Sequence, residues 1–173
     1  MTSADRIAAF GTIDGELAVG GVPLRRLAAR VGSTPFFAYD RRLLTERVDE
    51  LRRALPDRLG LSYAMKANPN LAVLDLFARL GSGFDIVSGG ELERVLAAGG
   101  DPARIVFSGV GKTESEMAAA LAAGILCFNV ESASELTRLD AVAGRAGGVE
   151  GNCVLRSPGS IWASTGSSSM WAK

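Results

Sequence analysis

The sequence predicts an α/β protein built on a parallel β-sheet, and three observations lead to that fold class. From residue 35 onward, short apolar runs alternate with amphipathic stretches, and one such pair occupies about 20–25 residues. Three of the amphipathic stretches begin with Ser/Thr-x-x-Glu, the capping box of a helix start. These boxes are Ser88/Glu91, Thr113/Glu116 and Ser132/Glu135. Glycines stand at or just after the ends of the stretches, as helix C-caps do. Apolar strands joined by helices form either a doubly wound sheet or a (β/α)8 barrel, and the spacing fits both.

The first predicted elements are a strand over residues 35–40 and a helix over residues 41–55. The strand is favoured by the aromatic residues that follow Pro35. The helix is favoured by apolar residues at i, i+4, i+7 and i+11, counted from Leu44, and Pro56 ends it. The alternation then predicts strands over 59–66, 83–87, 104–108 and 126–130, and helices over 71–80, 89–98, 114–123 and 133–143. Residues 152–156 are compatible with the start of one more strand.

Composition and charge exclude several classes of function. The chain has 173 residues, enough for one ordinary domain with its own core, and 19 acidic and 19 basic residues. The resulting net charge of zero indicates neither a nucleic-acid partner nor an anionic membrane partner. Histidine is absent, so no mechanism in this chain uses a histidine. Because the two cysteines, Cys127 and Cys153, are also distant in sequence, we predict no metal site.

The same features indicate a cytoplasmic protein. The first residues lack the basic region and long apolar run of a signal peptide. The longest apolar run, residues 117–128, is too short to span a bilayer. Two cysteines do not make a disulfide framework, and the composition suits a reducing compartment.

The pattern divides the chain into three parts. Residues 1–34 form an N-terminal segment, and residues 35–150 carry the strand-and-helix alternation. Residues 151–173 hold six serines, against nine in the first 150 residues, and no amphipathic pattern. We predict that this last part is a disordered tail or is foreign to the fold.

Two glycine-containing motifs are similar to phosphate-binding loops, but each has a simpler interpretation. Gly109–Thr113 reads GVGKT, the end of the loop G-x-x-x-x-G-K-[ST], yet the position of the first glycine is occupied by Val106. We therefore interpret GVGKT as a strand-to-helix turn in which Thr113 is the N-cap. The stretch SGGE at 88–91 is likewise explained by its capping box without any ligand.

Lys66 is the strongest candidate for a functional residue. It closes the predicted strand 59–66, and the strand-breaking residues of KANPN follow at once. A lysine at a strand end is commonly a solvated surface residue. The functional alternative is that a desolvated lysine amine becomes a nucleophile toward aldehydes, and in a (β/α)8 barrel the carboxyl ends of the strands form the active face. Asp85, near the end of strand 83–87, is either exposed on a loop or held by a cation.

Four motifs together resemble a known family. They are YAMKANPN at 63–70, GFDIVSGGEL at 83–92, IVFSGVGKTESEM at 105–117 and CFNVES at 127–132. In this order they are similar to the pyridoxal-phosphate-dependent decarboxylases of the alanine-racemase-like fold, the ornithine, diaminopimelate and arginine decarboxylase family. The likeness extends from about residue 15 to about residue 144, and within the family it is greatest to members that act on diaminopimelate.

The resemblance implies a fold, a cofactor and a reaction. The fold would be the N-terminal part of a (β/α)8 TIM barrel, with about four βα units and without the β-domain that follows in the family. Lys66 would hold pyridoxal 5'-phosphate through its amine, and Asp85 would lie near the cofactor and orient neighbouring polar groups. The reaction would convert meso-diaminopimelate to L-lysine and carbon dioxide. Full-length members of the family are homodimers with a small amino-acid substrate.

The sequence also departs from the family pattern. It has no histidine to stack on the cofactor ring, and the later glycine-rich phosphate loop and the substrate-binding arginines of the family have no counterpart. From these departures we expect a truncated or frame-shifted chain that does not decarboxylate by itself. Two alternatives stay open: a related decarboxylase of ornithine, arginine or a carrier-bound amino acid, and a non-catalytic protein that binds pyridoxal phosphate.

Overall fold

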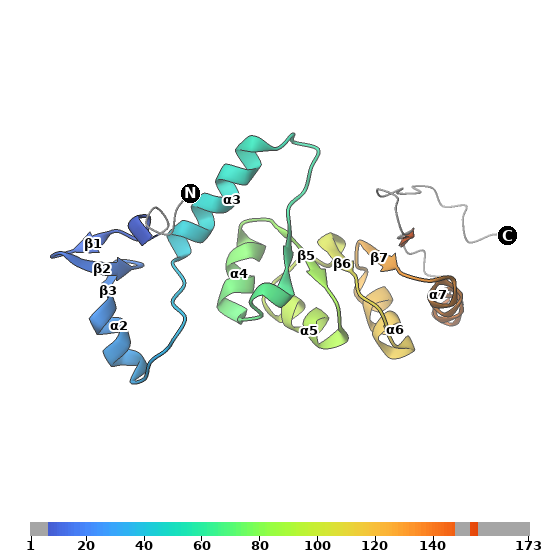
Figure 1. Cartoon of the computed structure of the whole chain (residues 1–173). Helices are drawn as coiled ribbons and strands as arrows, with labels where there is room; N and C mark the ends of the chain where they lie inside the picture. The colour runs from blue at the N-terminus through green and yellow to red at the C-terminus, as the bar shows by residue number, and fades with distance from the viewer. Residues whose placement is uncertain (1–6, 148–152, 156–173) are drawn as a thin grey trace. The chain divides into compact units, whose positions relative to one another are not determined.

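The structure, a computed structural model, describes residues 7–147 and 153–155 of the chain. These residues fall into two compact units, divided between Leu59 and Gly60 (Figure 1). Most of the tail predicted over residues 151–173 lies outside the described residues. Each unit is treated by itself below.

The first unit contains a small antiparallel sheet in the segment for which the sequence pattern predicted no elements. Its strands run in the order β1-β2-β3 and are joined by two-residue turns. The first turn is Asp14-Gly15 and the second Gly20-Gly21, and all four residues have positive φ. Such turns match the right-handed twist of paired strands, and glycine adopts them without steric cost. The elements are β1 (Thr12–Ile13), β2 (Glu16–Val19), β3 (Val22–Pro23) and helix α2 (Leu24–Val31).

The strand predicted over residues 35–40 is wrong. The backbone there is assigned no strand, and Phe37 and Tyr39 are exposed, Phe37 to 91%. Aromatic residues favour a strand only where a neighbouring strand supplies pairing and packing, and no such neighbour is present among the described residues. The helix that follows is confirmed as α3 (Arg41–Ala54).

The second unit is a parallel sheet whose strands lie in sequence order, β4-β5-β6-β7-β8. Every neighbouring pair is parallel. The predicted strands and helices are confirmed with shifts of a few residues at their ends. The strands are β4 (Ser62–Ala64), β5 (Gly83–Ile86), β6 (Ile105–Phe107), β7 (Cys127–Val130) and β8 (Cys153–Leu155). The helices are α4 (Leu71–Arg79), α5 (Gly89–Ala97), α6 (Glu114–Ala123) and α7 (Ala133–Arg145).

All four helices of this unit pack on one face of the sheet. The single core cluster joins buried residues of α4, α5, α6 and α7 to one alternating set of strand side chains. That set is Phe84, Ile86, Ile105, Phe107, Phe128 and Val130. A doubly wound sheet has helices on both faces and a reversal of strand order, whereas sequential strands with right-handed crossovers place every helix on the same side. The arrangement therefore matches the wall of a (β/α)8 barrel.

The helix starts confirm the predicted N-caps. The hydroxyls of Ser88, Thr113 and Ser132 each accept a hydrogen bond from the backbone N–H three residues on. Only Thr113 belongs to a complete capping box, in which the Glu116 carboxylate returns to the backbone N–H of Thr113. The carboxylate of Glu135 does not close such a box, because it accepts from the backbone N–H of Glu131 and forms an ion pair with Lys112.

Candidate functional site

The face of the sheet opposite the helices, called the inner face here, ends in a group of polar side chains. Its middle row consists of the cross-strand partners Ala64, Asp85, Val106 and Cys127. Side chains alternate between the faces of a strand, so Ser108, two residues after Val106, follows on the same face. Asp85, Val106 and Cys127 are half-buried, while their neighbours toward the helices are fully buried.

Lys66 lies just beyond β4, in the short 3₁₀ helix η1 (Met65–Ala67). The predicted strand thus ends two residues before the lysine, and Lys66 itself is exposed. Met65, its neighbour, is fully buried and anchors this turn in the core. The turn contacts β5, which carries Asp85. Lys66, just beyond β4, and Asp85, on the neighbouring strand β5, are therefore brought to adjacent segments of the fold.

The turn that carries Lys66 is held from the helix side. The ring of Tyr63 stacks on Phe77 with ring centroids 4.0 Å apart, and its hydroxyl donates to the carbonyl oxygen of Asn68 at 3.3 Å. The side chain of Asn70 then caps α4 by accepting from a backbone N–H. Packing and hydrogen bonds thus fix the residues on both sides of Lys66 and leave its side chain toward solvent.

The chain contains three lysines, Lys66, Lys112 and Lys173, and the structure separates the first two sharply. Lys112 belongs to the GVGKT motif, and its side chain is 0% exposed. Its ammonium donates to the carbonyl oxygens of Gly109 and Asn129 and to the carboxylate of Glu135. An ammonium has three N–H donors, and all three are used here. GVGKT is therefore a strand-to-helix turn, as predicted, and Lys112 cannot reach a phosphate.

Asp85 is neither on an exposed loop nor held by a cation, the two alternatives that the sequence left open. It is half-buried, and the hydroxyl of Ser108 donates a hydrogen bond to its Oδ1. Ser108 in turn accepts from the side-chain amide of Asn129 at 2.8 Å. A carboxylate of β5 is thus linked across the inner face to β6 and β7.

Sequence reasoning missed Ser108, Asn129, Lys112 and Glu135. One signal was available, because Lys112 and Asn129 are polar residues inside or beside runs that are otherwise apolar. Glu135 was interpreted only as the reciprocating member of a capping box. A capping box and a buried ion pair require the same glutamate, so the local pattern could not separate them.

Cys127 adds a thiol to the inner face. Burial first, and then the neighbouring Cys153 and Asp85, raise the pKa of the Cys127 thiol above its ordinary value. Burial likewise raises the pKa of Cys153. Both thiols are therefore held in the protonated form, which is a poor nucleophile and a poor metal ligand. Within residues 7–147 and 153–155, no three His, Cys, Asp or Glu side chains gather so that they could hold a metal ion.

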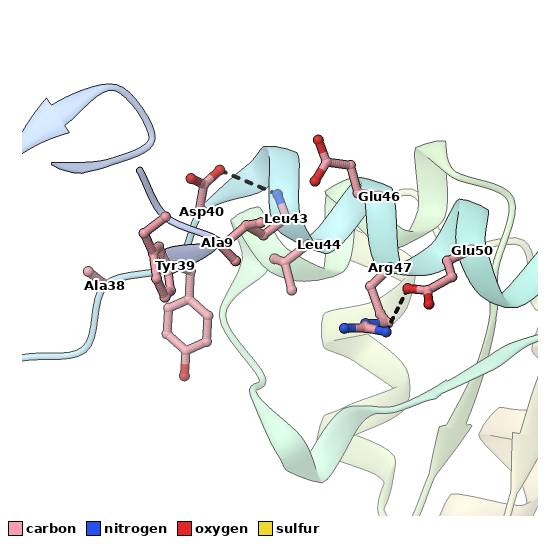
Figure 2. Close-up of a pocket in the computed structure, with 10 residues that line it drawn as sticks. Ala9, Ala38, Tyr39, Asp40, Leu43, Leu44, Glu46, Arg47 and Glu50 are labelled. Atoms are coloured by element: carbon pink, nitrogen blue, oxygen red, sulfur yellow. Dashed lines mark hydrogen bonds and ion pairs between the residues drawn. The ribbon is translucent and has the colours of Figure 1, made fainter. Parts of the chain in front are cut away.

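A separate cavity of about 570 Å³ lies in the first unit beside the start of α3 (Figure 2). Asp40 lines it, but the carboxylate is occupied by the backbone N–H groups of Gly20, Arg42 and Leu43. The Asp40 carboxylate and the Arg47–Glu50 ion pair of α3 are thus engaged within the unit. The polar groups of the inner face, and not this cavity, form the candidate site.

Comparison with known proteins assigns the chain to a class of protein. Residues 41–164 match the family model of the pyridoxal-dependent decarboxylases, pyridoxal binding domain. The chain therefore belongs to this family, and its cofactor is pyridoxal phosphate. No helix among the described residues is both long and apolar enough to cross a membrane.

The relatives of this chain include diaminopimelate decarboxylases. The chain is 57% identical to the diaminopimelate decarboxylase of Vibrio cholerae over 135 residues, which are 78% of this chain and 32% of that protein. A crystal structure of an Aquifex aeolicus protein matches with a TM-score of 0.80 and 42% identity, over 88% of this chain and 38% of that one. The diaminopimelate decarboxylase of Helicobacter pylori, complexed with L-lysine, matches with a TM-score of 0.71 and 41% identity, over 76% and 34% of the two chains. The chain spans about a third of the length of the curated relatives that it matches.

The residues present fit this cofactor. An aldehyde requires an amine that is accessible, and of the two lysines within the described residues Lys66 is exposed while Lys112 is enclosed. The neighbouring strand supplies the carboxylate of Asp85, already oriented by a hydroxyl donor.

Proposed function

We propose that this chain supplies the cofactor-binding lysine and the inner face of a pyridoxal-phosphate-dependent diaminopimelate decarboxylase, which converts meso-diaminopimelate to L-lysine and carbon dioxide. The observation that carries this proposal is the position of Lys66, exposed at the carboxyl end of β4 beside the strand of Asp85. The identity of 57% to a diaminopimelate decarboxylase favours this substrate over other amino acids.

Each residue has a distinct part in this proposal. Lys66 would hold the cofactor through its side-chain amine. When bound, pyridoxal phosphate supplies the electron-accepting ring that amino-acid decarboxylation requires. Asp85 faces the cofactor as a negatively charged hydrogen-bond acceptor, oriented by the hydroxyl of Ser108. The part that the family resemblance implies for Asp85 is to orient neighbouring polar groups, and an acceptor whose direction is fixed in advance does so without reorganisation at the moment of reaction.

The proposal includes a small amino-acid substrate, a homodimeric assembly of the full-length enzyme and a location in the cytoplasm. The substrate is supported by the names of the relatives, and the assembly by the family resemblance of the motifs. The location is supported by the two free cysteines, which suit a reducing compartment. Light scattering of the full-length chimaera described below tests the assembly, since a mass of one chain would contradict a dimer.

Covalent labelling tests the role of Lys66. The purified chain is incubated with pyridoxal phosphate, reduced with borohydride, digested and mapped by mass spectrometry. We expect the label on Lys66 and none on Lys112, which serves as an internal control because its amine is buried. The Lys66→Ala variant should lose the label. Equal labelling of wild type and variant, on Lys173 or the terminal amine, would contradict the proposal.

A chimaera tests the substrate. The 135 matched residues of this chain replace their counterparts in the Vibrio cholerae diaminopimelate decarboxylase, and carbon dioxide release is measured with diaminopimelate, ornithine and arginine. We expect release from diaminopimelate alone, and loss of that release on Lys66→Ala. A folded chimaera that binds pyridoxal phosphate but prefers ornithine or arginine would favour the alternative of a related decarboxylase. One that binds the cofactor and acts on none of the three would favour a non-catalytic binding protein.

A further inference from the structure

Behind the candidate site, on the helix side of the sheet, lies a buried ion pair that the proposed chemistry does not use. The ammonium of Lys112 is 2.6 Å from Oε1 of Glu135, and the two side chains are 0% and 4% exposed. Removing two charges from water is costly, and their attraction compensates only where the remaining polar atoms also find partners. A net gain in folding stability is therefore a weak explanation for this buried pair.

The pair fixes three segments at once. Lys112 donates to the carbonyl of Gly109 at 2.6 Å, in the turn after β6, and to the carbonyl of Asn129 at 2.8 Å, on β7. Glu135, in the first turn of α7, uses its second oxygen to accept from the backbone N–H of Glu131 at 3.3 Å. A side chain with three donors can satisfy two carbonyls and a carboxylate together, which no apolar side chain can do.

Asn129 connects this pair to the inner face. Its backbone carbonyl is bound by Lys112, while its side-chain amide donates to Oγ of Ser108 at 2.8 Å. The hydroxyl of Ser108 donates its single proton to Asp85. The direction of each bond is set by the one before it, because an amide nitrogen can only donate. The chain runs from Lys112 through Asn129 and Ser108 and ends on the Asp85 carboxylate.

We propose that Lys112 and Glu135 are positioning residues, which hold Asn129 and thereby orient the Ser108 hydroxyl and the Asp85 carboxylate toward the cofactor. The last link rests on the proposed function, since it is the proposal above that places Asp85 against the cofactor. The earlier links rest on the contacts alone. Loss of the pair should therefore loosen Asn129 whether or not a cofactor is bound.

Three variants and one matched control test the proposal. Glu135→Gln keeps the shape and removes the charge, and Lys112→Met with Glu135→Gln removes the pair. Ser108→Ala breaks the middle of the chain without changing charge. The control is Arg145→Met with Glu114→Gln, the same replacement in an ion pair between α7 and α6 whose side chains are 61% and 58% exposed.

The first measurement needs no cofactor. Hydrogen exchange of the Asn129 side-chain amide is followed by nitrogen-15 NMR. We expect exchange to accelerate at least about threefold in Glu135→Gln and in the pair variant, and to stay at the wild-type rate in the control. An unchanged exchange rate of the Asn129 side-chain amide in a folded Glu135→Gln variant would overturn the proposal. If the pair variant does not fold, the result for Glu135→Gln is sufficient by itself.

The second measurement follows the absorbance of bound pyridoxal phosphate during titration. We expect the pair variant and Ser108→Ala each to raise the dissociation constant about three- to tenfold, the effect of losing one hydrogen bond to an oriented group. Combining them should add little, because both act through Asp85. Unchanged affinity in the pair variant, or fully additive effects, would overturn the positioning role. A wild-type chain without Lys66-dependent absorbance would instead contradict the proposed function, and the exchange measurement would still decide whether Lys112 and Glu135 hold Asn129.

Discussion

Glu116 offers the most direct test of how the second unit is held together. Its carboxylate accepts from the backbone N–H of Gly89 at 2.8 Å, so a residue of α6 covers the start of α5. It also accepts from the backbone N–H and the hydroxyl of Thr113, at 2.9 and 2.8 Å. One side chain thus satisfies exposed donors at two helix N-termini, where a negative charge is favoured by the helix dipole.

We expect Glu116→Gln to lower the free energy of unfolding by about 1–2 kcal/mol at pH 7. A glutamine has one acceptor oxygen, so at least one of the two backbone donors, Gly89 or Thr113, must face an NH₂ group. The lost hydrogen bond and the weakened cap are each worth about 0.5–1.5 kcal/mol, which together make about 1–3 kcal/mol. Partial solvent exposure places the expected cost in the lower half of this combined range. The measurement is urea unfolding followed by circular dichroism.

The cost of Glu116→Gln should depend on pH. Hydrogen bonds from Gly89 and Thr113 lower the pKa of Glu116 below its ordinary value of 4.5. The stability that the carboxylate contributes is therefore fully present above about pH 4.5 and is lost as the pH falls through the lowered value. The difference between wild type and Glu116→Gln should shrink on acidification. The control Glu114→Gln, in the same helical turn, should cost about 0.5 kcal/mol or less because its ion pair is exposed. A pH-independent difference, or an equal cost for Glu114→Gln, would refute the assignment.

Two further predictions concern the other unit and the sheet. Burial alone would raise the pKa of Asp40, but three backbone N–H donors bring it below the ordinary value of 3.8, so Asp40→Asn should lower stability by about 1–2 kcal/mol above that pH and progressively less below it. Asp49→Asn, an exposed change on the same helix, is the control in the same urea titration, and an equal loss there would contradict the prediction. A Cβ on Gly83 would lie 2.5 Å from the carbonyl oxygen of Arg104, so Gly83→Ala should cost about 1–3 kcal/mol. Gly60→Ala, with nothing within 4 Å, should be neutral or slightly stabilising, and thermal unfolding that ranks the two the other way would refute the packing argument.

The second unit could be predicted closely because its local signals agree with one another. Apolar runs, Ser/Thr caps and glycine C-caps all specify the same boundaries, and α6 begins and ends at the predicted residues. The choice between a doubly wound sheet and a barrel wall could not be made from those signals. It depends on strand order, which is a long-range property that the resemblance supplied and the structure confirms.

The first unit was harder to predict because its structure depends on turns and on pairing. The hairpins of residues 12–23 are made by two short turns, Asp14-Gly15 and Gly20-Gly21, whose flanking strands are too short to show alternation. The aromatic stretch of residues 35–40 has strand propensity, yet propensity describes a fit to a pleated, half-buried surface. Because no partner strand is present among the described residues, Phe37 and Tyr39 of this stretch lie exposed.

The two lysines show why burial alone does not identify a reactive amine. Desolvation was the sequence-based reason to consider a lysine as a nucleophile. Of the two lysines within the described residues the desolvated one is Lys112, for which the pattern predicted only a turn. Its three N–H bonds all meet acceptors, so it presents no lone pair to an electrophile. Lys66 has the opposite surroundings, an exposed side chain on a turn whose flanking residues are anchored. We therefore propose a division of roles between the two: the enclosed ammonium of Lys112 orders the polar chain that ends on Asp85, and the accessible amine of Lys66, on a turn that contacts β5, meets the cofactor.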